Sequence, residues 1–240
     1  MPDSRTLRLV NVKPACENCH VRRLCLPVSL DAPDVERLNT LVHRRGPFKR
    51  GETLYQAGDP FGNLYAIQAG AIKTYGLTNE GQEQITGFHL PGELVGMDAI
   101  HSKVHPCHAV ALENTWVCEV PFDRLEALSA QVPGLQKEFI RIMSRELVAD
   151  QDSLMMMGKL SAEQRVLRLL TNIYRRLRVR LGNVEEIRLP MTREDIANYV
   201  GLTTETVSRV LTRLREEGVI EFRNRNVRFL DLDAAQRIAR

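Results

Sequence analysis

Hydrophobic and polar positions follow three different patterns along the 240-residue chain. In the first, ten of the 15 glycines lie between residues 46 and 96, at intervals of four to eight positions. Short apolar runs separate them, such as those at 53–55, 64–67 and 85–88. Short strands at regular spacing with glycine turns are typical of a sandwich, roll or barrel. The sequence therefore predicts a β domain in this region.

The second pattern has steps of three and four and runs through residues 133–158. This spacing predicts a helix of about 24 residues, which would be roughly 36 Å long, with Pro133 in its first turn. The stripe is narrower than a core-facing side and resembles a coiled-coil seam. A helix packed on its own domain is the alternative. The stripe, with one carboxylate inside it, consists of Ile140, Met143, Leu147, Asp150, Leu154 and Met157.

Asp150 would meet its symmetry mate if this helix formed a two-stranded dimer. Two nearby like charges repel and raise one of the two pKa values. The seam would then be weak and suited to a dimerisation switch. A solvated Asp150 at the edge of the seam is the alternative.

The third pattern predicts a compact last domain over residues 159–240. Ser161 caps an amphipathic helix, and two shorter helices follow it. Thr192 and Asp195 have the spacing of a capping box, Gly201 permits a sharp turn, and Thr203 is an N-cap candidate for the next helix. This order is typical of a helix–turn–helix.

The second helix of this motif has a polar face suited to reading DNA bases. Glu205, Ser208 and Arg209 lie at positions i, i+3 and i+4, opposite the apolar positions 207, 210, 211 and 214. An arginine can donate two hydrogen bonds to guanine, a glutamate can accept a hydrogen bond from cytosine, and a serine can form a hydrogen bond with either base. An ordinary solvated Glu–Arg pair is the alternative. The surrounding motif favours DNA recognition near the start of the helix.

A β-hairpin is predicted to follow, with strands at 218–222 and 227–230 around the turn 223–226. A helix–turn–helix followed by a hairpin is a winged helix, and a two-fold dimer of it would read two half-sites of DNA. Contacts to the phosphate backbone position such a protein without reading sequence. We expect them from Thr203, Arg213, Arg223 and Arg225.

The charge distribution supports this interpretation. The net charge of +3 hides a split between the two parts of the chain. Residues 1–159 carry 17 Lys+Arg and 19 Asp+Glu, whereas residues 160–240 carry 16 Arg, no Lys and 11 acids. The basic excess therefore coincides with the predicted double-stranded DNA-binding domain. No apolar run is long enough for a membrane helix, and the N-terminus resembles no signal peptide, so we expect a cytoplasmic protein without a membrane partner.

Three of the five cysteines, Cys16, Cys19 and Cys25, fall within ten residues. In a reducing cytosol such a group favours metal binding or redox chemistry over disulfides. A fourth ligand would have to come from Cys118, on a predicted strand, or from Cys107, in a loop with His101, His105 and His108 that matches no closed metal motif. Thiolates bind both zinc and iron–sulfur clusters, so both remain open at this point.

Together these residues resemble the FNR/ANR branch of the Crp/FNR superfamily of bacterial transcription regulators, from about Cys16 to Leu230. The specific segments are the cysteine motif at 16–25, Glu83–Leu90, Val117–Phe122 and Glu205–Arg209. The resemblance implies an α+β fold with a cyclic-nucleotide-binding-like β-roll, a long dimerisation helix and a C-terminal winged helix–turn–helix. The corresponding boundaries are 1–30 for the cysteine-rich segment, 31–130 for the sensor domain, 131–158 for the helix and 159–240 for the DNA-binding domain.

The resemblance also implies a function. Cys16, Cys19, Cys25 and Cys118 would bind one [4Fe–4S] cluster at low oxygen. The cluster would favour the homodimer, which would bind palindromes with TTGAT-like half-sites and control genes of anaerobic metabolism. Oxygen would convert the cluster to a [2Fe–2S] form and then leave the apo-protein, and the dimer would dissociate. Asp150 matches the family's charged seam position, and the loop around Gly81 matches a surface that contacts RNA polymerase.

Two features depart from the family pattern: His20, Arg22 and Arg23 lie beside the cysteines, and Cys107 is an additional thiol. Residues 98–110 offer no arginine for a cyclic phosphate, so we expect no cyclic-nucleotide ligand. A regulator of the same fold with structural zinc, or with no ligand, is the main alternative. No nucleophile–base set or phosphate loop indicates an enzyme.

Overall fold

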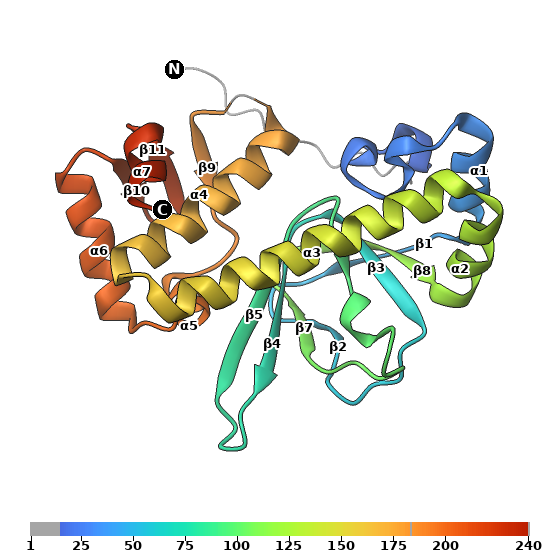
Figure 1. Ribbon diagram of the computed structural model, residues 1–240, viewed down its shortest axis with the longest axis horizontal. Helices are drawn as coiled ribbons and strands as arrows, with labels where there is room; N and C mark the ends of the chain where they lie inside the picture. Colours follow the sequence, from blue (N-terminus) through green and yellow to red (C-terminus); the bar gives the residue numbers. More distant parts are fainter. Residues whose placement is uncertain (1–14, 183, 240) are drawn as a thin grey trace.

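A computed structural model of the protein describes residues 15–182 and 184–239. Residues 1–14 of the predicted cysteine-rich segment lie outside the described residues. Two lobes are joined by the long helix α3 (Pro133–Lys159), which crosses the molecule (Figure 1). The predicted long helix is thus confirmed, and it is 27 residues long.

The sensor lobe contains two four-stranded sheets, with strand orders β1-β8-β3-β6 and β2-β7-β4-β5. Apolar residues such as Ile67, Ile72 and Val117 fill the space between the sheets. This arrangement confirms the predicted β-roll. The strands are β1 (His43–Phe48), β2 (Thr53–Tyr55), β3 (Asn63–Ala69), β4 (Ile72–Leu77), β5 (Glu83–His89), β6 (Leu94–Val95), β7 (His108–Ala111) and β8 (Thr115–Pro121).

The outer face of the first sheet is covered by helices. Successive side chains of a strand point to opposite faces, so Leu64 and Ala66 of β3 lie on this outer face while Tyr65 and Ile67 enter the roll. The covering elements are three short 3-10 helices (Cys16–Asn18, Arg22–Leu24 and Leu26–Ser29), α1 (Ala32–Leu41), α2 (Phe122–Gln131) and the first half of α3. The glycine pattern did not predict α1 or α2, which flank the turn-rich region.

The C-terminal lobe has the predicted winged helix–turn–helix. It consists of α4 (Ala162–Leu181), β9 (Glu186–Arg188), α5 (Arg193–Val200), α6 (Thr204–Glu216), β10 (Ile220–Arg223), β11 (Asn226–Phe229) and α7 (Leu232–Ile238). The sequence analysis missed β9 and α7. β9 pairs with β11 and extends the predicted hairpin to a three-stranded sheet.

Local sequence explains the ends of these helices. Ser161 and Gln164 form a capping box at the start of α4, and Thr192 and Asp195 form one at the start of α5. Gly201 ends α5 at a φ of 66°, which favours glycine, and the hydroxyl of Thr203 accepts from the Thr206 N–H at the start of α6. The predicted caps and turn are therefore confirmed.

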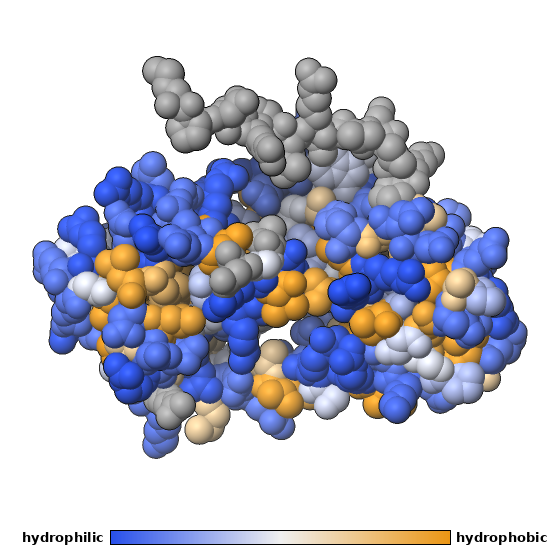
Figure 2. Space-filling view, turned by 90° about the horizontal axis from the view of Figure 1, so that it is seen from above, coloured by the Kyte–Doolittle hydropathy of each residue, from blue (hydrophilic) through white to orange (hydrophobic). Residues whose placement is uncertain are grey.

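The two lobes contact one another directly. The Asn198 side chain accepts from the Ile85 N–H at 2.6 Å and donates to the Glu83 carbonyl at 2.8 Å. Lys73 of β4 forms an ion pair with Asp195 of α5 at 3.0 Å. The surface seen in Figure 2 is mainly hydrophilic, with separate apolar patches on both halves of the molecule.

Candidate functional site

Four cysteines line one pocket of the sensor lobe. Cys16, Cys19 and Cys25 come from the segment of 3-10 helices, and Cys118 comes from β8 beneath it. Cys118 lies on the outer face of its sheet, like Val120, because the two residues are two positions apart on the strand. The remaining lining of this cysteine pocket is mostly apolar, and includes Val21, Leu26, Leu38, Ala66 and Val120.

Burial favours the protonated form of three thiols of the cysteine pocket, those of Cys16, Cys25 and Cys118. Burial raises the pKa of Cys25 and, against the opposing charge of Arg44, that of Cys16. Burial likewise raises the pKa of Cys118 to about 11. A metal binds the thiolate and displaces these protons, so uptake of a metal group here releases protons.

The donor set of the cysteine pocket consists of four thiols. Within residues 15–182 and 184–239, no three His, Cys, Asp or Glu side chains are close enough together to hold a single metal ion. Four thiols nevertheless surround one pocket, and beside them the buried Nε of Arg44 has no hydrogen-bond acceptor. Iron–sulfur clusters are held by four cysteines and present further sulfur acceptors.

Cys107 lies elsewhere, inside the β-roll. Its thiol donates to the Asp98 carboxylate at 3.2 Å, and burial raises its pKa to about 12. The neighbouring His105 is buried and stacks on Tyr55 with ring centroids 3.7 Å apart. Of the two candidates for the fourth thiol, the structure therefore brings Cys118 to the other three cysteines and places Cys107 in a different core.

The helix α3 presents two different faces. Leu135 and Ile142 are buried against the sensor lobe. The side chains of Ile140, Leu147 and Leu154 are 60%, 63% and 73% exposed, and Met143 and Met157 are also exposed. The predicted stripe therefore lies on the surface of the single chain, with exposed Asp150 between its apolar residues. The pKa of Asp150 is raised by partial burial and then by the charge of Asp98, before any symmetry mate is considered.

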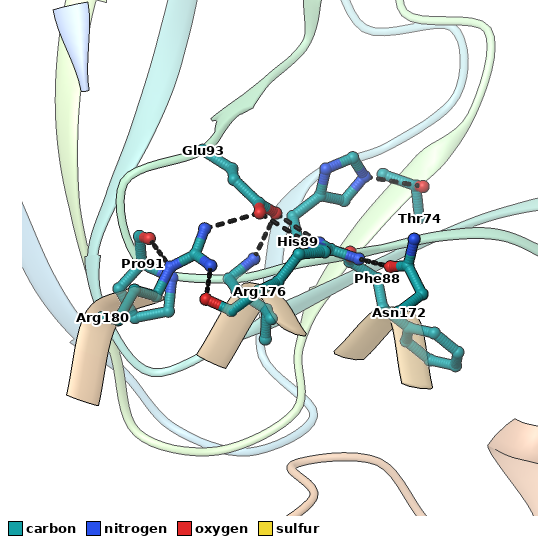
Figure 3. A network of polar contacts seen from close by, with 9 residues as sticks. Thr74, Phe88, His89, Pro91, Glu93, Asn172, Arg176 and Arg180 are labelled. Atoms are coloured by element: carbon teal, nitrogen blue, oxygen red, sulfur yellow. Dashed lines mark hydrogen bonds and ion pairs between the residues drawn. The ribbon is translucent and has the colours of Figure 1, made fainter. Parts of the chain in front are cut away.

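A cluster of charged residues joins the two lobes (Figure 3). We call Glu93, Arg176 and Arg180 the junction cluster. The Glu93 carboxylate accepts from Arg176 Nε at 2.9 Å and from Arg180 Nη2 at 2.6 Å. Arg176 also donates to the Phe88 carbonyl at 2.5 Å. Burial alone would raise the pKa of Glu93, but Arg176 and then Arg180 outweigh it and hold that pKa below its usual value.

The predicted base-reading residues lie on the outer side of α6. Val207, Leu211 and Leu214 are buried in the C-terminal lobe, so the opposite face is turned outward. Glu205 and Arg209 are exposed and Ser208 is half-buried. A shallow pocket beside them is lined by Ser208, Arg209, Thr212, Arg213 and Glu216.

The four residues expected at the DNA backbone have different surroundings. The Thr203 hydroxyl caps α6, and Arg225 donates to the Pro190 carbonyl at 3.1 Å. Arg213 pairs with Glu217 at 2.8 Å and Arg223 pairs with Glu221 at 2.7 Å, both near the surface. Exposed pairs of this kind contribute little energy and exchange easily, so Arg213 and Arg223 are more available to phosphates than Thr203 or Arg225.

Gly81 occupies the tip of the β4–β5 hairpin, which projects from the body of the molecule (Figure 1). Its φ of 77° favours glycine, and the Thr78 carbonyl accepts from its N–H at 2.8 Å. The hairpin tip is exposed from residue 79 to residue 83.

Comparisons with known proteins match both lobes. Residues 45–132 match the model of the cyclic nucleotide-binding domain, and residues 164–238 match the Crp-like helix-turn-helix domain. The transcriptional activator protein anr of Pseudomonas aeruginosa is 45% identical, over 90% of this chain and 88% of its own. The fumarate and nitrate reduction regulatory protein of Escherichia coli is 40% identical, over 100% of this chain and 97% of its own. The chain belongs to the FNR/Anr family of Crp-type regulators.

Membership in the FNR/Anr family makes the chain a DNA-binding transcription regulator and not an enzyme. The solved structure of FixK2 from Bradyrhizobium japonicum has a TM-score of 0.74 at 27% identity, and covers 83% of this chain and 98% of that one. Within the described ranges 15–182 and 184–239, none of the helices has the length and apolar character needed to span a bilayer.

Two features of the structure, the position of Arg44 and the junction cluster, were not predicted from the sequence. Arg44 contacts the cysteine pocket from β1, and no motif around it indicated a role. The junction cluster joins Glu93 to arginines more than eighty positions away. One signal was present for the junction cluster: residues 160–240 contain 16 arginines, many more than the four expected to contact DNA.

Proposed function

We propose that this protein is a cytoplasmic, oxygen-responsive transcription regulator of anaerobic metabolism, in which Cys16, Cys19, Cys25 and Cys118 hold a [4Fe–4S] cluster. The observation that carries the proposal is the convergence of these four thiols on one pocket, although 93 positions separate Cys25 from Cys118. When bound, the cluster supplies sensitivity to oxygen. Family membership supports an iron–sulfur group in general.

The cysteine segment is connected to the dimerisation helix by direct contacts. The Ser29 hydroxyl, four positions after Cys25, donates to the Glu138 carboxylate of α3 at 3.3 Å. Glu138 is 2% exposed and also accepts from Arg141 at 2.6 Å. Leu30 packs beside Gly134 in the first turn of α3. Ordering the cysteine segment around a bound group therefore also orders the start of α3.

The exposed stripe of α3 suits a second copy of the chain. Its residues have the spacing of a coiled-coil seam, and covering apolar side chains of this size is favourable by about 1.5–3 kcal/mol each. Asp150 opposes this gain because two copies would bring two carboxylates together. The balance produces a homodimer when the cluster is bound and a monomer when it is absent.

The dimer would present two copies of α6 to double-stranded DNA. Glu205, Ser208 and Arg209 would read base edges of a TTGAT-like half-site, while Arg213 and Arg223, with smaller contributions from Thr203 and Arg225, would contact the backbone. The projecting hairpin with Gly81 would contact RNA polymerase. We propose that no cyclic nucleotide is required. In the loop between β5 and β6, the Glu93 carboxylate already accepts hydrogen bonds from Arg176 and Arg180.

Anaerobic purification tests the proposal. The native chain should be coloured and should contain about four iron and four acid-labile sulfide per monomer. Cys118→Ser should lose this content, whereas Cys107→Ser, which alters the thiol inside the β-roll, should keep it. A colourless native protein containing zinc would refute the sensor function.

Asp150→Ala tests the dimerisation step. Removing the repelling carboxylate should shift the air-exposed apo-protein toward the dimer in sedimentation velocity experiments. Asp152→Ala is the matched control, because Asp152 lies on the same helix but pairs with Arg168 at 3.0 Å. An Asp150→Ala profile that coincides with that of the native protein contradicts the repulsion account.

A further inference from the structure

Arg44 lies against the cysteine pocket from the sheet below it. It stands opposite Cys118 in the register of β1 and β8, and directly paired residues of an antiparallel sheet share a face. Its Nη2 is 3.9 Å from the Cys16 sulfur. One guanidinium therefore adjoins a thiol of the 3-10 segment and a thiol of the sheet.

Asn39 of α1 holds this guanidinium in place. Its side-chain oxygen accepts from Arg44 Nη2 at 2.7 Å and also from the backbone N–H of Cys16 at 3.0 Å. A single oxygen thus connects the cation to the first cysteine. These two contacts set the orientation of Arg44, since no acidic side chain of the described residues forms an ion pair with it.

The Arg44 Nε is buried and has no hydrogen-bond acceptor among residues 15–182 and 184–239. Leaving a buried N–H of a charged group unpaired costs more free energy than leaving a neutral one unpaired. Such a group in a native protein calls for an acceptor, and the adjoining pocket is lined by thiols. Sulfur bound to iron carries negative charge and accepts hydrogen bonds.

We propose that Arg44 is a positioning residue for the cluster, which donates hydrogen bonds to cluster sulfur and balances the negative charge of the four thiolates. This inference rests on the proposed function. Two physical effects support it. A neighbouring cation favours the thiolate over the thiol, and hydrogen bonds to the sulfurs of a cluster, like burial, set its reduction potential and stability.

The next residue along the strand provides a matched control. Arg45 points to the other face of the sheet, where it pairs with Glu119 at 3.2 Å and is about half exposed. Arg44 and Arg45 thus have the same charge and the same strand but differ in their access to the cysteine pocket. A general effect of removing one arginine from β1 would be the same at both positions.

The experiment compares Arg44→Gln, Arg44→Lys and Arg45→Gln with the native chain after anaerobic reconstitution with iron and sulfide. Iron and sulfide per chain, the reduction potential and the rate at which visible absorbance is lost at one oxygen concentration are measured. Arg44→Gln should weaken cluster retention by about 10-fold or more and accelerate the loss in air. Arg44→Lys should recover part of this effect, because it restores charge but not the Nε donor. Arg45→Gln should behave as the native chain does.

The outcomes separate the two proposals. Native protein that takes up no iron and sulfide overturns the proposed function and this inference with it. Native protein that carries the cluster, together with Arg44 variants of native iron content, potential and oxygen lability, overturns this inference alone. Thermal unfolding of the apo-proteins checks the fold. If Arg44→Gln does not fold, the Arg44→Lys variant tests the inference instead. An Arg44→Lys protein with the iron and sulfide content, reduction potential and oxygen lability of the native chain would refute the role of Arg44.

Discussion

Arginine serves opposite purposes in two regions of this molecule. In the junction cluster, Arg176 and Arg180 are largely buried and share one carboxylate, that of Glu93. On the surface that we propose to face DNA, Arg209, Arg213 and Arg223 are exposed.

The difference follows from the surroundings of the charges. A buried charge must keep its partner, because removing the partner leaves the charge without solvent. An exposed pair contributes little and is readily exchanged for another anion, such as a phosphate. The buried arginines therefore set the position of the C-terminal lobe, and the exposed ones remain available to DNA.

The sharpest test of this comparison is Glu93→Gln. It removes the carboxylate that Arg176 and Arg180 share, and should lower the free energy of unfolding by about 3 kcal/mol. Chemical denaturation at neutral pH measures the loss. Glu83→Gln is the control, since its exposed pair with Lys73 predicts a small change. Equal effects of the two variants would show that burial does not distinguish them.

Arg209→Ala addresses the exposed region. DNA affinity for the preferred half-site should fall by about 1–3 kcal/mol, and discrimination at one base position should relax. Binding is measured on a set of operators with single base changes, at fixed salt. Arg215→Ala, on the same helix, serves as the control. A loss of equal size on every operator would mean that Arg209 touches only phosphate.

Glu146 provides a pH test of the junction. Burial, and then the charge of Glu93, raise the pKa of Glu146 to about 7. The charge of Asp150 also raises this pKa, whereas the charges of Arg176 and Arg145 oppose the shift. Because the folded-state pKa is raised, the folded protein keeps a proton that the unfolded chain loses between about pH 4.5 and 7. Native stability should therefore fall across this window as pH rises.

Glu146→Gln should remove this fall, which we expect to be about 1–2 kcal/mol after allowing for partial exposure. Denaturation of the apo-protein at pH 5 and pH 8 measures it. Parallel pH curves for the variant and the native chain would contradict the assignment.

The smallest effect is expected from Arg213→Ala. This side chain is on the surface and pairs with Glu217 and Glu163, so unfolding should be unchanged. DNA binding should weaken similarly on all sequences, with a salt dependence reduced by about 0.9 in slope. Titrations at several salt concentrations test this, and an unaltered slope would remove Arg213 from the backbone contacts.

Much of the C-terminal lobe could be predicted because its signals are local. Ser161 with Gln164, Thr192 with Asp195 and Gly201 act within one helical turn, so their residue types specify caps and turns directly. The same is true of α3, whose exposed stripe can be counted in steps of three and four. The strand β9 was missed because three residues carry too little pattern, and it is stabilised by pairing with β11 and by the burial of Ile187 in the core.

The sequence by itself determined the helix ends, the outward face of α6, the stripe of α3 and the family to which the chain belongs. Only the tertiary structure decided which distant residues meet: Cys118 with the other three cysteines, Arg44 with the cysteine pocket, and Glu93 with Arg176 and Arg180. The physical reason is that periodicity and capping depend on neighbours in the chain. The partner of a buried thiol or charge depends on which faces of the sheets and helices are packed together.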